Sequence, residues 1–140
     1  MHLLKYQGIT GYADLAAATV APRLPRSALV PVPRVLSRRL KYGVDPALLL
    51  ARSLAAILGV DVCNALAAPF HSGRRAGGDH GRPADRFRLR RPPPAHVVLV
   101  DDVVTTGATV RAAIDALGSS RVVAVAAANT VSGVSSVLAS

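Results

Sequence analysis

One segment, residues 97–110, constrains the fold of this chain more than any other. It begins with the apolar run Val97–Val100, passes through two aspartates, and reaches a turn rich in Thr and Gly that opens a helical pattern. A short, continuous apolar run is typical of a strand buried on both faces. In open α/β sheets, ligands bind beyond the carboxyl ends of such strands. The segment therefore predicts an α/β fold with a functional site at this strand end.

The rest of the chain alternates between helical and strand patterns. Asp45 is placed to cap a helix with Pro46 in its first position, running to Leu58 and stopped by Gly59. The other expected elements are helices over Tyr12–Ala21 and Ala108–Leu117 and strands over Ala28–Val32, Val60–Leu66 and Arg121–Ala127. This order predicts one domain over residues 1–140, with a parallel twisted sheet flanked by helices.

The composition indicates a folded, strongly basic protein. Hydrophobic residues make up 51% of the 140 residues, enough to bury a core, and the formal net charge is +9. The excess of positive charge calls for an anionic partner such as nucleic acid, a phosphate ligand or a membrane surface. No apolar run approaches the roughly 20 residues of a spanning helix, so we expect a cytoplasmic protein without membrane association. The single cysteine, Cys63, excludes a disulfide framework and a cysteine-based zinc site.

Basic residues gather in two places. The first cluster, Arg34, Arg38, Arg39 and Lys41, follows the strand expected at Ala28–Val32. These side chains either contact a phosphate or form a solvated face. The second cluster lies in an Arg/Gly-rich segment, residues 71–96, which reads as a long flexible loop. This loop is either a hood that closes over a substrate or a solvated connection.

The turn after the apolar run has the chemistry of a phosphate site. Its residues, Thr105, Thr106, Gly107, Ala108 and Thr109, would present successive backbone N–H groups and three hydroxyls at a helix N-terminus. Asp101 and Asp102 cannot contact a phosphate favourably, but their carboxylates suit the 2′- and 3′-hydroxyls of a ribose. The pattern therefore indicates a ribose-phosphate ligand; the alternative is a polar strand-to-loop transition without a ligand.

This arrangement resembles the phosphoribosyl diphosphate motif of the type I phosphoribosyltransferases. The chain is similar, more narrowly, to the ComF family of competence-associated phosphoribosyltransferase-like proteins. Three further segments are similar to that family: Lys5–Gly8, Leu29–Pro33 and Tyr42–Asp45. The resemblance extends roughly from Leu3 to Ala128.

The resemblance implies a protein that binds phosphoribosyl diphosphate with Mg²⁺ and transfers the phosphoribosyl group to an unknown acceptor. It assigns the pyrophosphate to the loop after the first strand, with Pro33, Arg34, Arg38 and Arg39 as candidate contacts. Mg²⁺ would be held through the ligand, with Asp101 and Asp102 as further candidates, and no catalytic residue is assigned. Thr105 stands where hypoxanthine-guanine-type members carry an acid, which disfavours purine salvage.

The chain also departs from the family pattern. ComF proteins usually carry a cysteine-rich zinc ribbon before this domain, and none precedes it here, so the chain is either a short member or lacks its start. Tyr42 and Pro46 replace an Arg and a Gln or His of the family run. The alternative function, which the net charge of +9 supports through phosphate contacts, is a non-catalytic, nucleic-acid-associated accessory protein in competence, DNA uptake or repair. The sequence leaves the oligomeric state open, with a homodimer among the alternatives.

Overall fold

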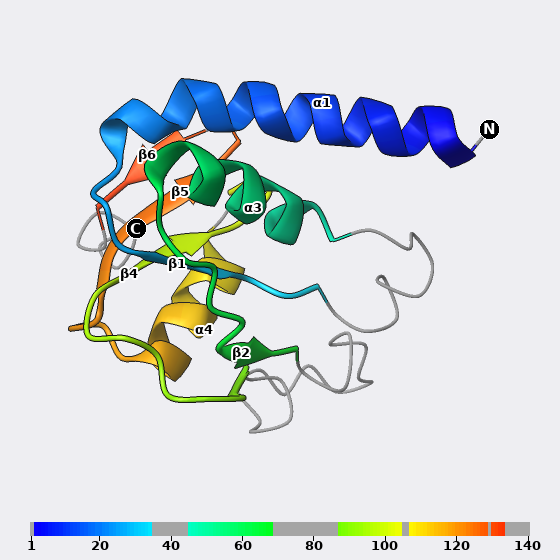
Figure 1. The fold of residues 1–140 in the computed structure, drawn as a ribbon. Helices are drawn as coiled ribbons and strands as arrows, with labels where there is room; N and C mark the ends of the chain where they lie inside the picture. Colours follow the sequence, from blue (N-terminus) through cyan, green and yellow to red (C-terminus); the bar gives the residue numbers. More distant parts are fainter. Residues whose placement is uncertain (1, 35–44, 69–86, 105–106, 129, 134–140) are drawn as a thin grey trace, which may run out of the picture.

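The computed structural model describes residues 2–34, 45–68, 87–104, 107–128 and 130–133, with the backbone alone described for residues 2–10. Its centre is a four-stranded sheet with the strand order β1-β4-β5-β6 (Figure 1). The strands are β1 (Ala28–Pro31), β4 (Val97–Val100), β5 (Val122–Ala127) and β6 (Thr130–Ser132). β4 coincides with the predicted strand, and β1 and β5 each fall one residue short of their predicted bounds.

The sheet is mixed, with mostly parallel strands. β4 runs parallel to both β1 and β5, whereas β6 lies antiparallel to β5. The predicted parallel sheet is confirmed for β1, β4 and β5, and the antiparallel strand β6 at this edge was not predicted. A parallel partner requires a crossover of a dozen or more residues, and only Ala128 and residue 129 separate β5 from β6. The α/β class, a sheet flanked by helices, is confirmed.

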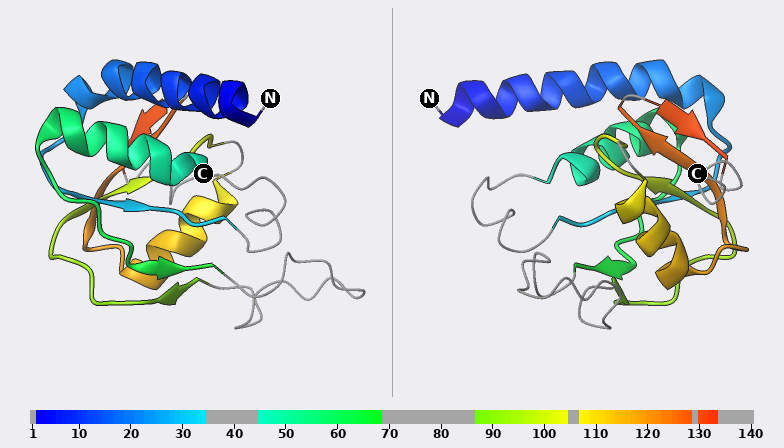
Figure 2. Two further views of the ribbon diagram at one scale, coloured as in Figure 1. Left: turned by 45° about the vertical axis from the view of Figure 1, so that its right-hand side comes forward. Right: turned by 180° about the vertical axis from the view of Figure 1, so that it is seen from behind.

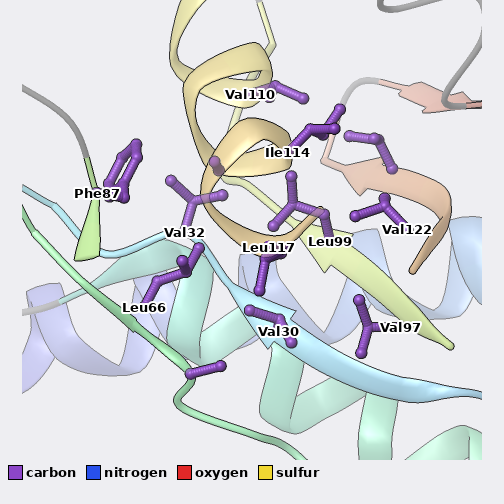
Figure 3. Packing of buried hydrophobic residues seen from close by; sticks show 13 residues of the cluster. Val30, Val32, Leu66, Phe87, Val97, Leu99, Val110, Ile114, Leu117 and Val122 are labelled. Carbon is purple, nitrogen blue, oxygen red and sulfur yellow. The ribbon is translucent and has the colours of Figure 1, made fainter. Parts of the chain in front are cut away.

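Helices cover both faces of the sheet. α1 (His2–Val20) and α3 (Pro46–Leu58) lie together on one face, and α4 (Ala108–Leu117) lies on the other (Figures 1 and 2). The side chains of β4 alternate between the two layers: Val98 and Val100 pack with α1 and α3, whereas Val97 and Leu99 pack with α4. Figure 3 shows the second of these cores, with Leu99 among residues of α4 and neighbouring strands. All four β4 side chains are buried, as the continuous apolar run predicts.

The capping signals around α3 are confirmed. The Asp45 carboxylate accepts a hydrogen bond from the backbone N–H of Leu48 at 3.4 Å, and Pro46 opens the helix. Gly59 ends it in the left-handed conformation, with φ of 68°. α1, in contrast, begins ten residues before the predicted Tyr12 and passes at its end into a 3₁₀ turn, η1 (Ala21–Arg23).

The segment predicted as a strand over Val60–Leu66 divides into two parts. Val62 forms an isolated parallel bridge with Leu29 of β1. Farther along, β2 (Leu66–Ala67) pairs antiparallel with β3 (Arg88–Leu89) in a separate two-stranded sheet. β3 lies inside the segment predicted as a loop, so that prediction is wrong for residues 88–89. Residues 69–86, which hold most of the arginines of that segment, lie outside the described residues.

None of the helices in the described part of the chain has the length and apolar character needed to cross a membrane.

Candidate functional site

Two strand ends bring the predicted site residues to one edge of the sheet. β1 and β4 are parallel neighbours, with Pro31 opposite Val100, and the backbone N–H of Val32 donates to the Val100 carbonyl at 2.8 Å. The carboxyl ends of both strands therefore meet. Arg34 follows one of these ends and the two aspartates follow the other, although the two positions are 68 residues apart in the sequence.

Asp101 is the buried member of the aspartate pair. Its residue is 9% exposed, the only buried polar or charged residue among those described. Its carboxylate accepts a hydrogen bond from the backbone N–H of Asp102 at 2.8 Å. Burial, reinforced by the hydrogen bond to the Asp102 side chain and by the negative charge of Asp102, raises the pKa of Asp101 from 3.8 to about 7.

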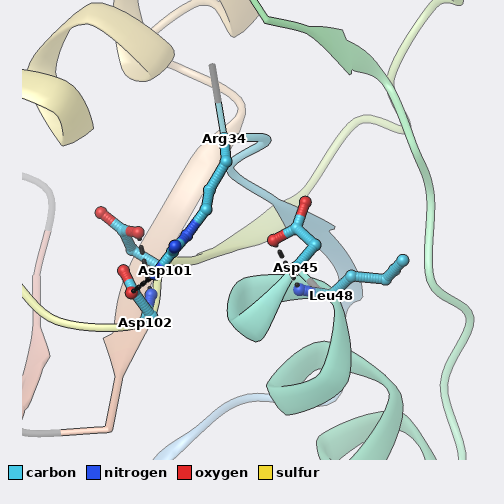
Figure 4. A network of polar contacts seen from close by, with 5 residues as sticks. All are labelled: Arg34, Asp45, Leu48, Asp101 and Asp102. Atoms are coloured by element: carbon cyan, nitrogen blue, oxygen red, sulfur yellow. Dashed lines mark hydrogen bonds and ion pairs between the residues drawn. The ribbon is translucent and has the colours of Figure 1, made fainter. Parts of the chain in front are cut away.

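Asp102 is the more accessible carboxylate and is paired with Arg34 (Figure 4). Nη2 of Arg34 lies 3.0 Å from Oδ2 of Asp102, with the two side chains 27% and 34% exposed. Burial alone would raise the pKa of Asp102. Hydrogen bonds from the side chain of Asp101, the backbone N–H of Val103 and Arg34 outweigh it, so this pKa lies below its ordinary value of 3.8. Asp102 is thus the ionised member of the pair at neutral pH.

The turn at the start of α4 faces a small cavity beside Asp101. Gly107 precedes the helix in the left-handed conformation, with φ of 82°. The cavity has a volume of about 40 Å³ and is lined by Asp101, Val103, Val104, Gly107, Ala108, Thr109 and Val110. Three of the five residues predicted for a phosphate turn therefore line one cavity with the buried aspartate. Thr105 and Thr106 lie outside the described residues.

Arg111 is a site residue that the sequence analysis missed. A Cβ atom built on Gly107 would lie 3.1 Å from Nη1 of Arg111, so this guanidinium lies directly beside the turn. Arg111 is four residues after Gly107, and long helical side chains point toward the N-terminus of their helix. That spacing is a signal in the sequence that could have identified it. The helix dipole disfavours a cation in the first turn, so the position of Arg111 marks it as a candidate anion contact.

The remaining predicted contacts divide between described and undescribed residues. Pro33 is half-buried and directly precedes Arg34, whereas Arg38 and Arg39 lie outside the described residues. The part of the chain that the structure describes contains no group of three His, Cys, Asp or Glu side chains that could hold a metal. The donor set at this edge is two carboxylates, one of them with a raised pKa. Such a set fits Mg²⁺ that arrives on ligand phosphates and keeps its waters, not an all-protein cage.

These features define a class of protein: an α/β sheet protein whose carboxyl edge combines an acidic pair, an arginine that follows the neighbouring strand and a glycine turn at a helix N-terminus. The family model of the phosphoribosyl transferase domain matches residues 43–138, and the chain belongs to this family. No curated protein and no solved structure shows a significant match to the chain. The predicted resemblance to the type I phosphoribosyltransferases is thereby confirmed, and the narrower resemblance to ComF proteins stays a prediction.

Proposed function

We propose that this protein binds phosphoribosyl diphosphate together with Mg²⁺ and transfers its phosphoribosyl group to an acceptor. The observation that carries the proposal is the convergence of three chemistries on one sheet edge. The start of α4 shares the cavity beside Gly107 with Asp101, and Arg34, which follows β1, contacts the neighbouring Asp102. A sugar with a phosphate at one end and a diphosphate at the other needs these three kinds of group.

The 5′-phosphate would bind at the start of α4. Backbone N–H groups of the first turn of a helix point toward its N-terminus, and the helix dipole favours an anion there. Gly107 lets the backbone approach the ligand closely because it has no side chain. The guanidinium of Arg111 lies beside the same turn and would add a charge-assisted hydrogen bond.

The ribose hydroxyls would bind to the aspartate pair. An ionised carboxylate is purely an acceptor, which matches the hydroxyl donors of a ribose. Asp102, with its lowered pKa, supplies the ionised carboxylate, and Asp101 lines the cavity next to it. Together they would set the orientation of the sugar between its two anionic ends.

The diphosphate would lie over the loop after β1. Arg34 is the described cation of this loop, and its planar guanidinium suits two phosphate oxygens at once. Bound Mg²⁺ would neutralise charge on the pyrophosphate. The residues at this edge would then orient the ribose and hold the leaving group.

In the transfer step, an acceptor nucleophile forms a bond to C1 of the ribose while the bond from C1 to the pyrophosphate oxygen breaks. The pyrophosphate leaves with the bonding electron pair, and the acceptor gives up its proton to solvent. The transition state has oxocarbenium character, so positioning and stabilisation of the leaving group would supply the rate enhancement. We assign no general base, and we leave the acceptor open. The ComF-like segments favour a competence-associated member of the family.

Calorimetry with phosphoribosyl diphosphate in the presence of Mg²⁺ tests the binding part of the proposal. We expect Asp101→Asn/Asp102→Asn to lower the affinity at least about 100-fold, since each charged hydrogen bond contributes about 1.5–3 kcal/mol. The matched control is Asp61→Asn/Asp115→Asn, which removes the same charge from two exposed positions outside the site. An unchanged affinity in the first variant would contradict the site assignment.

A pyrophosphate-release screen tests the transfer. The purified protein is incubated with phosphoribosyl diphosphate, Mg²⁺ and a panel of bases and amines. We expect release above the acceptor-free rate with one acceptor class and its loss in the Asp101→Asn/Asp102→Asn variant. Tight binding without release for any acceptor would reduce the proposal to a ligand-binding protein.

A second candidate function, nucleic-acid association, is favoured by a groove at the opposite end of the sheet. The groove has a volume of about 390 Å³ and is lined in part by residues that come just before β4 and β5 in the chain. Its lining residues are Leu89, Arg90, Arg91, Pro92, Pro93, Leu117 and Arg121. Nη1 of Arg121 donates to the Pro93 carbonyl at 3.1 Å, which orders one wall. Arg90 and Arg91 are exposed and available for phosphate contacts.

Salt-dependent binding of single-stranded DNA distinguishes this candidate. We expect Arg90→Gln/Arg91→Gln to reduce the slope of log affinity against log salt by roughly 1–2, about one per phosphate contact. The control Arg23→Gln/Arg52→Gln removes two exposed charges elsewhere. A wild-type protein that ignores DNA at moderate salt would remove this candidate.

A further inference from the structure

Arg34 and Asp102, which are both proposed to contact the ligand, form an ion pair with each other. Asp102 is the ionised carboxylate proposed for the ribose, and Arg34 is the cation proposed for the pyrophosphate. In the structure, Nη2 of Arg34 lies 3.0 Å from Oδ2 of Asp102. One of the oxygens that would accept a ribose hydroxyl is therefore already engaged, and so is a guanidinium donor of the pyrophosphate loop.

The burial of the pair makes this engagement more than an incidental surface contact. The two side chains are 27% and 34% exposed, so neither charge is fully hydrated. Moving Arg34 away would leave a partly desolvated carboxylate beside a second aspartate, at a cost above that of an exposed pair. Arg34 can leave at low cost only if another anion receives it while other donors reach Asp102.

We propose that Arg34 is a specificity-determining residue that makes the site select phosphoribosyl diphosphate over ribose 5-phosphate. The inference rests on the proposed function. Arg34 stays on Asp102 in the absence of a diphosphate and so competes with the ribose hydroxyls. A diphosphate offers the guanidinium two or more phosphate oxygens, which it binds in a bidentate manner, and Asp102 is then released for the sugar.

This competition has opposite consequences for the two ligands. Phosphoribosyl diphosphate brings both the anion that receives Arg34 and the hydroxyls that replace it at Asp102. Ribose 5-phosphate has its one phosphate at the start of α4, so at the ion pair it brings only hydroxyls and must displace Arg34 without offering it a diphosphate. A ligand can shift this two-state arrangement only by its difference in affinity for the two states, and that difference is larger for the diphosphate because it provides new partners for both Arg34 and Asp102.

Calorimetry on Arg34→Gln tests the proposal, because the affinities for the two ligands should change in opposite directions. We expect the affinity for phosphoribosyl diphosphate with Mg²⁺ to fall at least about 10-fold, the loss of one charged contact to phosphate. We expect the affinity for ribose 5-phosphate to rise roughly 3- to 10-fold, because its competitor is gone. The control Arg26→Gln removes the same charge at an exposed position before β1 and should change neither affinity.

The reciprocal variant uses inorganic pyrophosphate as the probe. Asp102→Asn weakens the hold on Arg34, so we expect the affinity for pyrophosphate to rise several-fold. Loss of a nearby negative charge could also favour an anion, and the double variant Arg34→Gln/Asp102→Asn separates the two causes. If Arg34 is the mediator, Asp102→Asn raises the pyrophosphate affinity in the wild-type background and not in the Arg34→Gln background.

The possible outcomes are distinct. A fall in the affinity for both ligands in Arg34→Gln would make Arg34 a general contact of the site and overturn the proposal. An unchanged affinity for ribose 5-phosphate would make it a simple pyrophosphate ligand, again overturning it. In both cases the proposed function survives, because the wild-type protein still binds phosphoribosyl diphosphate.

Failure of the wild-type protein to bind either ligand would overturn the proposed function and this inference together. Melting temperatures of all variants identify any loss of folding, and the gain in Asp102→Asn cannot arise from unfolding.

Discussion

The carboxylate of Asp101 accepts a hydrogen bond from the backbone N–H of its neighbour Asp102, with 2.8 Å between the nitrogen and Oδ1. The contact holds two carboxylates together at the end of a buried strand, where they cannot both ionise without a cost. Burial raises the pKa of Asp101 to about 7, whereas Asp102, with Arg34 beside it, keeps a pKa below its ordinary value. The pair thus divides into a neutral and an ionised member in slightly acidic solution.

This division predicts how the stability of the ligand-free protein depends on pH. Between pH 3.8 and about 7, the unfolded chain has released the proton of Asp101 and the folded protein retains it. The free energy of unfolding therefore falls as the pH rises through this range. The lowered pKa of Asp102 contributes to the free energy of unfolding with the opposite sign, but this contribution is lost only below its ordinary pKa of 3.8. We expect Asp101→Asn to be more stable than wild type at pH 8, by roughly 1–4 kcal/mol, and to match it near pH 4.

Urea denaturation at a series of pH values measures this effect. The control Asp115→Asn removes an exposed carboxylate from α4 and should give a curve parallel to that of the wild type. A loss of stability in Asp101→Asn at pH 8 would contradict the prediction, because it would show that the surroundings of Asp101 stabilise its ionised carboxylate in the folded state.

Gly107→Ala tests the turn at the start of α4. Gly107 has a φ of 82°, where an alanine costs roughly 1–2 kcal/mol, and the new Cβ would lie 3.1 Å from Nη1 of Arg111. We expect lower thermal stability and at least about a 10-fold loss of affinity for ribose 5-phosphate, because the turn must shift.

Gly59→Ala is the matched control for the backbone strain. Gly59 has a φ of 68° at the end of α3, and a Cβ there would have no neighbour within 4 Å. This variant should lose a similar amount of stability and retain the wild-type affinity. Equal losses of affinity in both variants would mean that the turn acts only through stability.

Arg111→Gln tests the cation that lies beside the turn. We expect the affinity for ribose 5-phosphate to fall roughly 10- to 100-fold, since a charged hydrogen bond to phosphate contributes about 1.5–3 kcal/mol. Its loss should also reduce the rise in melting temperature that saturating ribose 5-phosphate produces. Arg52→Gln, on the exposed surface of α3, provides the charge-matched control. Wild-type affinity in Arg111→Gln would assign the phosphate to the helix N–H groups without this residue.

Asp45→Ala tests the cap of α3. The Asp45 side chain accepts the Leu48 N–H at 3.4 Å, and its removal should lower the free energy of unfolding by about 1 kcal/mol. Asp45→Asn keeps an acceptor oxygen in the same place and should lose only a few tenths of that amount. Chemical denaturation of the two variants compares them directly, and an equal loss in both would show that the charge, not the capping bond, stabilises this helix.

The elements that could be predicted carry their signals within a few neighbouring residues. The β4 run is apolar at every position because both faces are covered, and α3 carries Asp45, Pro46 and Gly59 at its two ends. The elements that were missed lack such signals. Gly8 and Gly11 argue locally against a helix that nevertheless extends through them, and β2, β3 and β6 are two or three residues long. Segments so short become strands only when a partner lies beside them.

For the candidate site, the types of group could be predicted from local sequence patterns: the aspartate pair after a buried strand and the glycine turn before a helix. Those groups are neighbours along the chain, so their chemistry can be recognised without a fold. The contact of Arg34 with Asp102 across 68 residues, and the burial of Asp101 in preference to Asp102, depend on the tertiary structure. So do the position of Arg111 at the turn and the antiparallel edge of the sheet. Ion pairing, burial and strand pairing depend on distances in space, and no local sequence pattern encodes those distances. At this site the parallel pairing of β1 with β4 sets them.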